Sequence, residues 1–225
     1  MEIVSDLEAN IREQEVLRYL GYNRKSAQPK NEVMETLDEV KRDYGLIQPK
    51  AVYTWVEVEE MKGGLLVLKG GLRLSLGSNT RFWKGAEYLA IALCTIGSGL
   101  ENKVSELFAQ GEFPLALMLD SVGSVAADSI ADQVNSLICQ RANLLGVRVG
   151  PRLSPGYGKW ELQDQKVLFH ILTGEKIGVQ LNEHCTMIPQ KSISFGAGVG
   201  KDVASGKRAN PCRYCSMEDC LYRVS

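Results

Sequence analysis

Residues 116–144 carry the strongest fold signal in this chain, a long apolar stripe with helical spacing. Apolar residues recur there at intervals of three and four and are interrupted by acids and amides, which is the pattern of a helix with one broad buried face. Part of that face has only very small side chains, at Gly123, Ala126 and Ala127. We therefore expect another element of the fold to approach this helix closely.

Strand patterns occur on both sides of this helix in the sequence. Residues 51–59 alternate between apolar and polar side chains, as in a strand with one buried face. Lys69-Gly70-Gly71 separates two apolar runs, and glycine can adopt the positive φ that a hairpin turn needs. The apolar run 86–96 suits a strand or a helix by length, and we interpret it as a strand. Strands are predicted at residues 51–59, 65–68, 72–76, 86–96, 176–181 and 187–195.

Shorter helical patterns complete the expected architecture. They predict helices over residues 11–20, 31–44, 100–110 and 162–172, the first with a capping box formed by Asn10 and Glu13. Because strands and helices do not alternate regularly, the fold class is α+β, with a mixed or antiparallel sheet and flanking helices. We expect one domain over residues 1–200, with a helical N-terminal part at 1–48, and a Cys-rich tail at 201–225.

Charge and hydropathy exclude two classes of partner. The 225 residues carry a formal net charge of −1, so no overall basic field attracts nucleic acid. The longest uncharged stretch, residues 88–100, is much shorter than the roughly 20 apolar residues that a membrane helix needs. The acidic N-terminus lacks the features of a secretion signal, so we expect a cytoplasmic protein that does not enter a membrane.

A short turn, RLSPGYG at residues 152–158, is the first candidate binding site. Arg152 can hold a carboxylate through two parallel hydrogen bonds, and Tyr157 offers a flat aromatic surface. Pro155 and Gly156 favour a tight turn, whose backbone amides we expect to point outward. Such a loop could hold a small zwitterionic ligand. The alternative interpretation is a plain turn with a surface arginine.

The segment that begins with this turn resembles the C-terminal, AdoMet-binding activation domain of cobalamin-dependent methionine synthase. In that family an R-x-x-P-G-Y loop and a helix precede the pattern I-G-x-x-L-x-E-x-x-x-M-x-P-x-x-S-x-S. The resemblance extends over about residues 85–195. The matching residues are Arg152, Pro155, Gly156, Tyr157, Ile177, Gly178, Leu181, Glu183, Met187, Pro189, Ser192 and Ser194.

The resemblance implies a free-standing activation protein that binds S-adenosylmethionine (AdoMet). By analogy Arg152 binds the AdoMet carboxylate, backbone groups near Ser154 and Gly156 meet the adenosine, Tyr157 lines the side of the methyl group, and Glu183 attracts the positive charge. No catalytic residue is implied. The implied partners are a cobalamin-binding methyltransferase or corrinoid protein supplied in trans and a flavodoxin-like or ferredoxin-like reductant. The implied role is accessory: it supports reductive methylation of inactive cob(II)alamin.

The sequence departs from the family pattern after Ser194. The family continues with aromatic residues that contact AdoMet, whereas this chain reads FGAGVGKD at residues 195–202. That glycine-rich run is not a phosphate-binding loop, because Phe195 replaces the first glycine of the Walker pattern and Asp202 replaces its Ser or Thr. We interpret it as a flexible hinge before the tail.

The second candidate site is the cysteine cluster of the tail. Cys212, Cys215 and Cys220 lie within nine residues. Three thiolates so near to one another can hold zinc or an iron-sulfur cluster. His184 or Cys185 could supply a fourth ligand. The alternative function is therefore a non-catalytic metal or iron-sulfur module that serves a corrinoid protein in docking or electron transfer.

Overall fold

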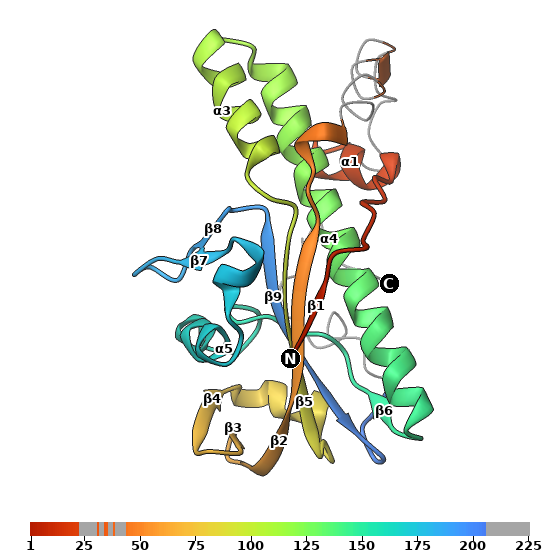
Figure 1. Ribbon diagram of the computed structural model, residues 1–225, viewed down its shortest axis with the longest axis vertical. Coiled ribbons are helices and arrows are strands. Elements are labelled where there is room, and N and C mark those ends of the chain that lie inside the picture. The colour runs from red at the N-terminus through yellow and green to blue at the C-terminus, as the bar shows by residue number, and fades with distance from the viewer. Residues whose placement is uncertain (23–30, 32–33, 36–37, 39–43, 206–225) are drawn as a thin grey trace.

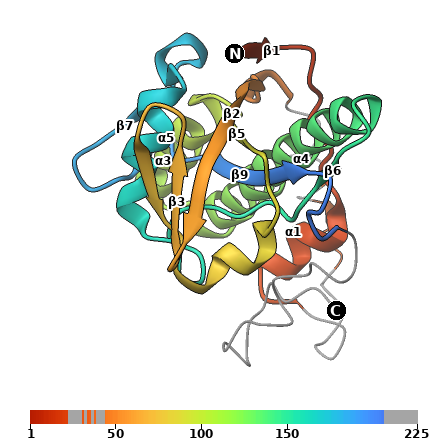
Figure 2. The same cartoon turned by 90° about the horizontal axis from the view of Figure 1, so that it is seen from below.

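A computed structural model describes residues 1–22, 31, 34, 35, 38 and 44–205 of the chain. A twisted sheet forms its centre, with the long helix α4 along one face and α5 on the other (Figures 1 and 2). The α+β class predicted from sequence is confirmed. The predicted helix over residues 31–44 falls largely outside the described residues, and so does most of the predicted tail, from residue 206 onward.

Every pairing in the sheet is antiparallel. Six of its seven strands follow the order β4-β3-β2-β5-β9-β6, and the seventh, β1, pairs with β2. A two-stranded sheet, β7-β8, stands apart. The strands are β1 (Glu2–Val4), β2 (Lys50–Lys62), β3 (Leu65–Leu68), β4 (Leu72–Ser75), β5 (Tyr88–Thr95), β6 (Arg148–Val149), β7 (Gln180–Leu181), β8 (Met187–Ile188) and β9 (Ser192–Gly200).

The helices predicted at residues 11–20, 100–110, 116–144 and 162–172 form, the last as a 3-10 turn followed by a helix. Two strand predictions need correction: residues 176–181 end a 3-10 turn and form only the short β7, and residues 187–195 divide into β8 and the start of β9. The helices are α1 (Glu13–Tyr19), α3 (Gly99–Gln110), α4 (Phe113–Leu144) and α5 (Gln165–Ile171), and the 3-10 turns are η1 (Tyr44–Leu46), η2 (Gly77–Trp83), η3 (Leu162–Asp164) and η4 (Gly174–Ile177).

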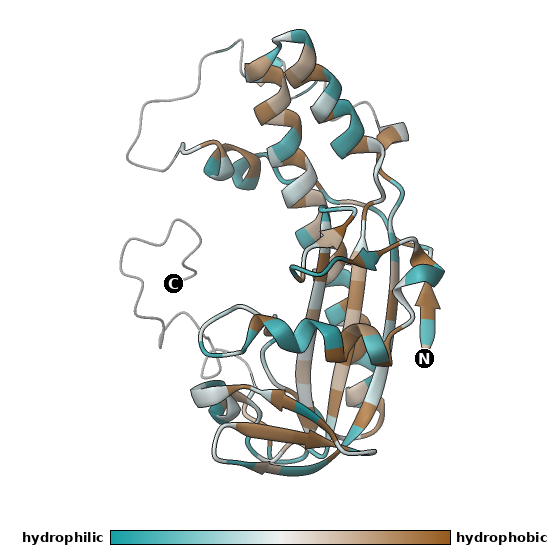
Figure 3. Ribbon diagram, turned by 90° about the vertical axis from the view of Figure 1, so that its left-hand side faces the viewer, coloured by the Kyte–Doolittle hydropathy of each residue, from teal (hydrophilic) through white to brown (hydrophobic). Residues whose placement is uncertain are grey.

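The alternation of side chains along the strands builds one apolar core on each face of the sheet. On β5, Ala90, Ala92 and Cys94 face α4, whereas Leu89 and Leu93 face η2 and α5. The small side chains on the α4 side let the helix lie close to the sheet. Figure 3 shows apolar residues along the strands, while α3 and α4 alternate apolar and hydrophilic positions.

The section of α4 with small side chains is a point of close contact, as predicted. A Cβ atom added at Gly123 would lie 2.7 Å from Leu100 Cδ2 and 3.3 Å from Lys191 Cε, so only glycine fits there without displacing a neighbour. By length and composition α4 could also cross a membrane, but 61% of its most apolar stretch is buried within the fold. Packing against the sheet accounts for its apolar face.

The glycine-rich run after Ser194 is a buried central strand, so our interpretation of it as a flexible hinge is wrong. Residues 195–200 belong to β9, which pairs with β5 along its length and is buried. Gly196 and Gly198 lie beneath two indole rings, because a Cβ at either position would contact Trp83, and one at Gly196 would also contact Trp160. Those two rings, packed edge to face at 5.4 Å, fill the space above the glycines.

Candidate functional site

The segment that carries Arg152 continues from β6 along the outer side of β9. Leu153 forms an isolated bridge with Gly196, and its side chain is buried in the core shared with η2 and α5. Arg152 lies on the other side, against α4, with its guanidinium carbon 5.7 Å from the centre of the Phe195 ring. The local alternation of an extended segment thus buries one neighbour and leaves the arginine beside the helix.

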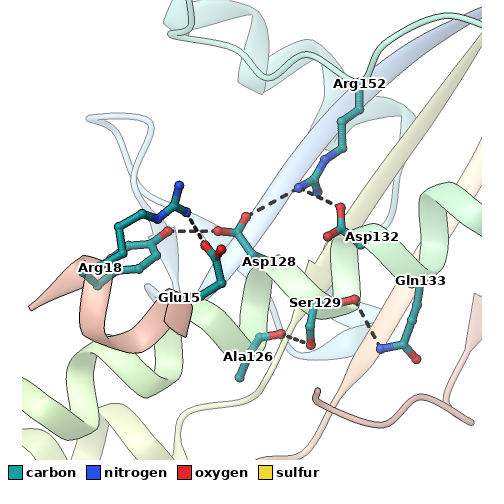
Figure 4. A network of polar contacts seen from close by, with 9 residues as sticks. Glu15, Arg18, Ala126, Asp128, Ser129, Asp132, Gln133 and Arg152 are labelled. Atoms are coloured by element: carbon teal, nitrogen blue, oxygen red, sulfur yellow. Dashed lines mark hydrogen bonds and ion pairs between the residues drawn. The ribbon is translucent and has the colours of Figure 1, made fainter. Parts of the chain in front are cut away.

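Two aspartates of α4 hold the guanidinium. Arg152 Nη2 lies 3.1 Å from Asp132 Oδ1 and 3.6 Å from Asp128 Oδ1, and the Tyr19 hydroxyl of α1 donates to Asp128 Oδ2 at 2.9 Å (Figure 4). Asp128 and Asp132 are one helical turn apart, so both point from the same face. Sequence reasoning missed them, although two acids four residues apart in an otherwise apolar helix were a usable signal.

These ion pairs orient the arginine more than they stabilise the fold. The Arg152 side chain is 28% exposed, and the two aspartate side chains are 43% and 56% exposed. Partly exposed pairs of this kind contribute only about 0–1 kcal/mol, because water and salt screen them.

An open groove of about 760 Å³ lies along the same face of α4, and Asp132 is one of its lining residues. Its other wall is the segment 6–12, which is tied to the helix by hydrogen bonds. The Asn10 amide donates to Ser129 Oγ at 3.0 Å, and Gln133 Nε2 donates to the Glu8 carbonyl at 2.6 Å. Asn10 is therefore part of the groove wall and not the predicted cap of α1, whose N-cap is Arg12.

The backbone amides of the turn do not point outward as predicted. The Gly156 amide, with φ +87°, donates to the Trp160 carbonyl at 3.0 Å, and the Tyr157 amide donates to the Ser154 carbonyl at 3.1 Å. Pro155 is buried, Ser154 is half-buried, and Tyr157 is 71% exposed. The turn therefore presents the tyrosine ring to solvent and uses these two amides internally.

Glu183 is not brought into the Arg152 network. It lies in the turn between β7 and β8, where its side chain is 85% exposed and pairs with His184 at 3.4 Å. The neighbouring Cys185 is buried, and its thiol contacts Gln163 Oε1 of η3 at 3.2 Å. This hairpin therefore packs on η3, whereas Arg152 packs on α4.

The predicted metal ligands Cys212, Cys215 and Cys220 lie outside the described residues. Within the part of the chain that the structure does describe, no group of three His, Cys, Asp or Glu residues could hold a metal ion. Zinc or an iron-sulfur cluster in the tail, with Cys185 or His184 as a fourth ligand, stays a prediction from sequence.

Comparison with known proteins finds a solved structure with a similar fold. No family model and no curated protein sequence matches the chain. The fold is similar to that in the crystal structure of the MetH reactivation domain bound to AdoHcy, with a TM-score of 0.61 and 14% sequence identity over 91% of this chain and 80% of that chain. At this identity the likeness establishes the fold alone. The protein therefore has the fold of the MetH reactivation domain.

Proposed function

We propose that this protein binds AdoMet in the groove beside Arg152 and presents it to a cobalamin protein. The observation that carries the proposal is the ion pair between Arg152 and Asp132, because Asp132 lines a groove of about 760 Å³ although Arg152 itself is not a lining residue. Small-molecule sites usually enclose about 300–1,000 Å³. The structural neighbour was crystallised with AdoHcy, the product that AdoMet becomes when it gives up its methyl group.

Arg152 is proposed to bind the carboxylate of the methionine part. A guanidinium presents two parallel N–H donors that match the two oxygens of a carboxylate. The weak, partly exposed pairs with Asp128 and Asp132 hold it in place until the ligand arrives.

The positive groups of AdoMet, its ammonium and its sulfonium, are proposed to face the acids of the groove. Asp6, Glu8 and Asp132 all line it. We assign this role to these groove acids in preference to Glu183, whose side chain lies in the exposed β7-β8 turn. The zwitterionic ligand then lies with its carboxylate at the arginine and its cations along the acids.

The function served is reactivation of a cobalamin-carrying methyltransferase or corrinoid protein supplied in trans. One-electron reduction of inactive cob(II)alamin by a flavodoxin-like or ferredoxin-like protein, followed by methyl transfer from AdoMet, restores the partner. This chain contributes positioning, which can be worth about 7–11 kcal/mol when two reactants are held in line. A general base has no part in it, and the exposed Tyr157 lies where a docked partner can reach it.

Calorimetric titration with AdoMet tests the proposal. We expect saturable binding by the wild type and a loss of about 10- to 150-fold in Arg152→Ala, the range expected when a charge-assisted hydrogen bond worth 1.5–3 kcal/mol is removed. Arg148→Ala is the matched control, because Arg148 is an exposed arginine on the adjacent β6. It should bind AdoMet as the wild type does.

Decarboxylated AdoMet identifies the group that Arg152 meets. The wild type should bind this analogue about as weakly as Arg152→Ala binds AdoMet, and the variant should lose nothing further on the analogue. A wild type that binds neither AdoMet nor AdoHcy refutes the proposed function. Docking is tested separately, by co-purification of a cobalamin protein with the wild type.

A further inference from the structure

Two buried polar side chains hold the turn at residues 155–160 from the side opposite Arg152. Asn79 in η2 is 6% exposed, and its Nδ2 donates to the Tyr157 carbonyl at 3.0 Å. Asp164 at the end of η3 is 8% exposed, and its Oδ2 accepts from Trp160 Nε1 at 2.9 Å and from the Ser75 amide. Neither residue belongs to the groove or to the Arg152 network.

The carboxylate of Asp164 joins three segments that are far apart in sequence. It links the end of β4, through the Ser75 amide, to the indole of Trp160 and to η3. Burial raises the pKa of Asp164, which means that the fold holds this group against a desolvation cost. A core formed only to exclude water would not place a carboxylate there.

Asn79 acts on the backbone of the turn directly, and Asp164 acts on it through the side chain of Trp160. The Trp160 carbonyl accepts the Gly156 amide, so fixing the indole of Trp160 also fixes the far end of the turn. Asn79 fixes its middle through the Tyr157 carbonyl. The fit is close, because a Cβ at Gly158 would lie 3.0 Å from Asn79 Oδ1, and Gly158 has φ +62°.

We propose that Asn79 and Asp164 are positioning residues for the AdoMet site, which act through the turn and do not touch the ligand. This inference rests on the proposed function. The turn begins three residues after Arg152 and carries Tyr157, so we infer that its shape helps to set where these two side chains stand relative to the groove. Misplacement by about 1 Å is enough to cost up to roughly 100-fold in a site that works by orientation.

Substitution of Asp164 separates positioning from folding. Asp164→Asn keeps an acceptor for both donors, whereas Asp164→Ala removes it. We expect Asp164→Asn to bind AdoMet within about threefold of the wild type, and Asp164→Ala and Asn79→Ala to bind it about 10- to 100-fold more weakly. Val104→Ala is the control, because it removes two methyl groups from a buried side chain of α3 outside this turn, and it should bind normally.

Hydrogen exchange of the turn gives a readout that does not depend on the ligand. The Gly156 amide should exchange at least about tenfold faster in Asp164→Ala and at the wild-type rate in Asp164→Asn and Val104→Ala. Unchanged exchange in Asp164→Ala overturns the positioning role, whether or not the wild type binds AdoMet. Faster exchange with unchanged AdoMet affinity also overturns it. A wild type without AdoMet affinity refutes the proposed function instead.

Discussion

Replacement of Gly198 by alanine tests whether β9 is a buried strand. The new Cβ would lie 2.6 Å from Trp83 Cβ and 2.7 Å from Trp83 Cγ. That is about 1 Å less than the 3.5–4.0 Å separation of packed carbon atoms. Both atoms are at the root of a side chain that is fully buried, so rotation of the ring cannot relieve the contact. The backbone of β9 or η2 must move.

The expected cost of Gly198→Ala is about 3 kcal/mol, the upper end of the range for overpacked cores. Gly196→Ala is the matched comparison, because it lies two residues away on the same face of the strand. Its Cβ would meet the far ends of side chains, two ring tips at 3.1 and 3.2 Å and Leu89 Cδ1 at 3.4 Å, so we expect about 1 kcal/mol. In a flexible hinge the same substitutions would instead stabilise the protein by about 0.4–1 kcal/mol, through the unfolded chain.

Equilibrium urea denaturation, followed by tryptophan fluorescence and far-ultraviolet circular dichroism, measures both variants. The midpoint should fall in the order wild type, Gly196→Ala, Gly198→Ala, with an unchanged slope. A Gly198→Ala midpoint equal to or above that of the wild type would refute the argument. A reversed order of the two variants would show that the indole contacts do not set the cost.

Three further predictions concern buried polar groups. Burial raises the pKa of Asp164 above its ordinary value of 3.8, so the stability that this group contributes is complete below that value and is lost as the pH rises through the raised pKa. Urea midpoints measured from about pH 3 upward should therefore fall relative to Asp164→Asn, and parallel curves would contradict this. Burial outweighs the opposing effect of Arg152 and raises the pKa of Cys94 to about 12. Peptide mapping should therefore find Cys94 unalkylated by iodoacetamide at about pH 8 in the folded protein. Labelling as fast as in urea would disprove this. Lys191 Nζ contacts Asp120 at 2.8 Å and Ser124 Oγ at 2.9 Å, and only 15% of the Lys191 side chain is exposed. Asp120→Ala should therefore lower the free energy of unfolding by about 1–2 kcal/mol, because it leaves a partly buried charge without its partner. Adding Lys191→Met to that variant should recover part of the loss. A double variant less stable than Asp120→Ala would count against this account.

Local patterns were sufficient for the elements whose burial is regular along the chain. Period two at residues 51–59 and the long stripe at 116–144 predicted β2 and α4, because the apolar positions of each pack against a core; Val52, Val56 and Val58 of β2 do so on one face. The hairpin turn was also predictable: Gly70 and Gly71 adopt φ +90° and +79°.

The pattern failed at β9 because its burial does not depend on its own side chains. Gly196, Ala197 and Gly198 carry almost no apolar surface, and a hydrophobic period cannot appear where side chains are missing. The surface that buries this strand comes from Trp83 and Trp160, which are distant in sequence.

The sequence by itself determined the chemistry available to the site, and the tertiary structure determined which groups meet. Arg152 and the Pro155-Gly156 turn were recognisable because their chemistry and backbone preference are local. The pairing of Arg152 with Asp128 and Asp132, the groove that segment 6–12 completes, and the separation of Glu183 depend on packing α4 against the sheet. Distances between such residues are set by the shared core, which no local pattern encodes.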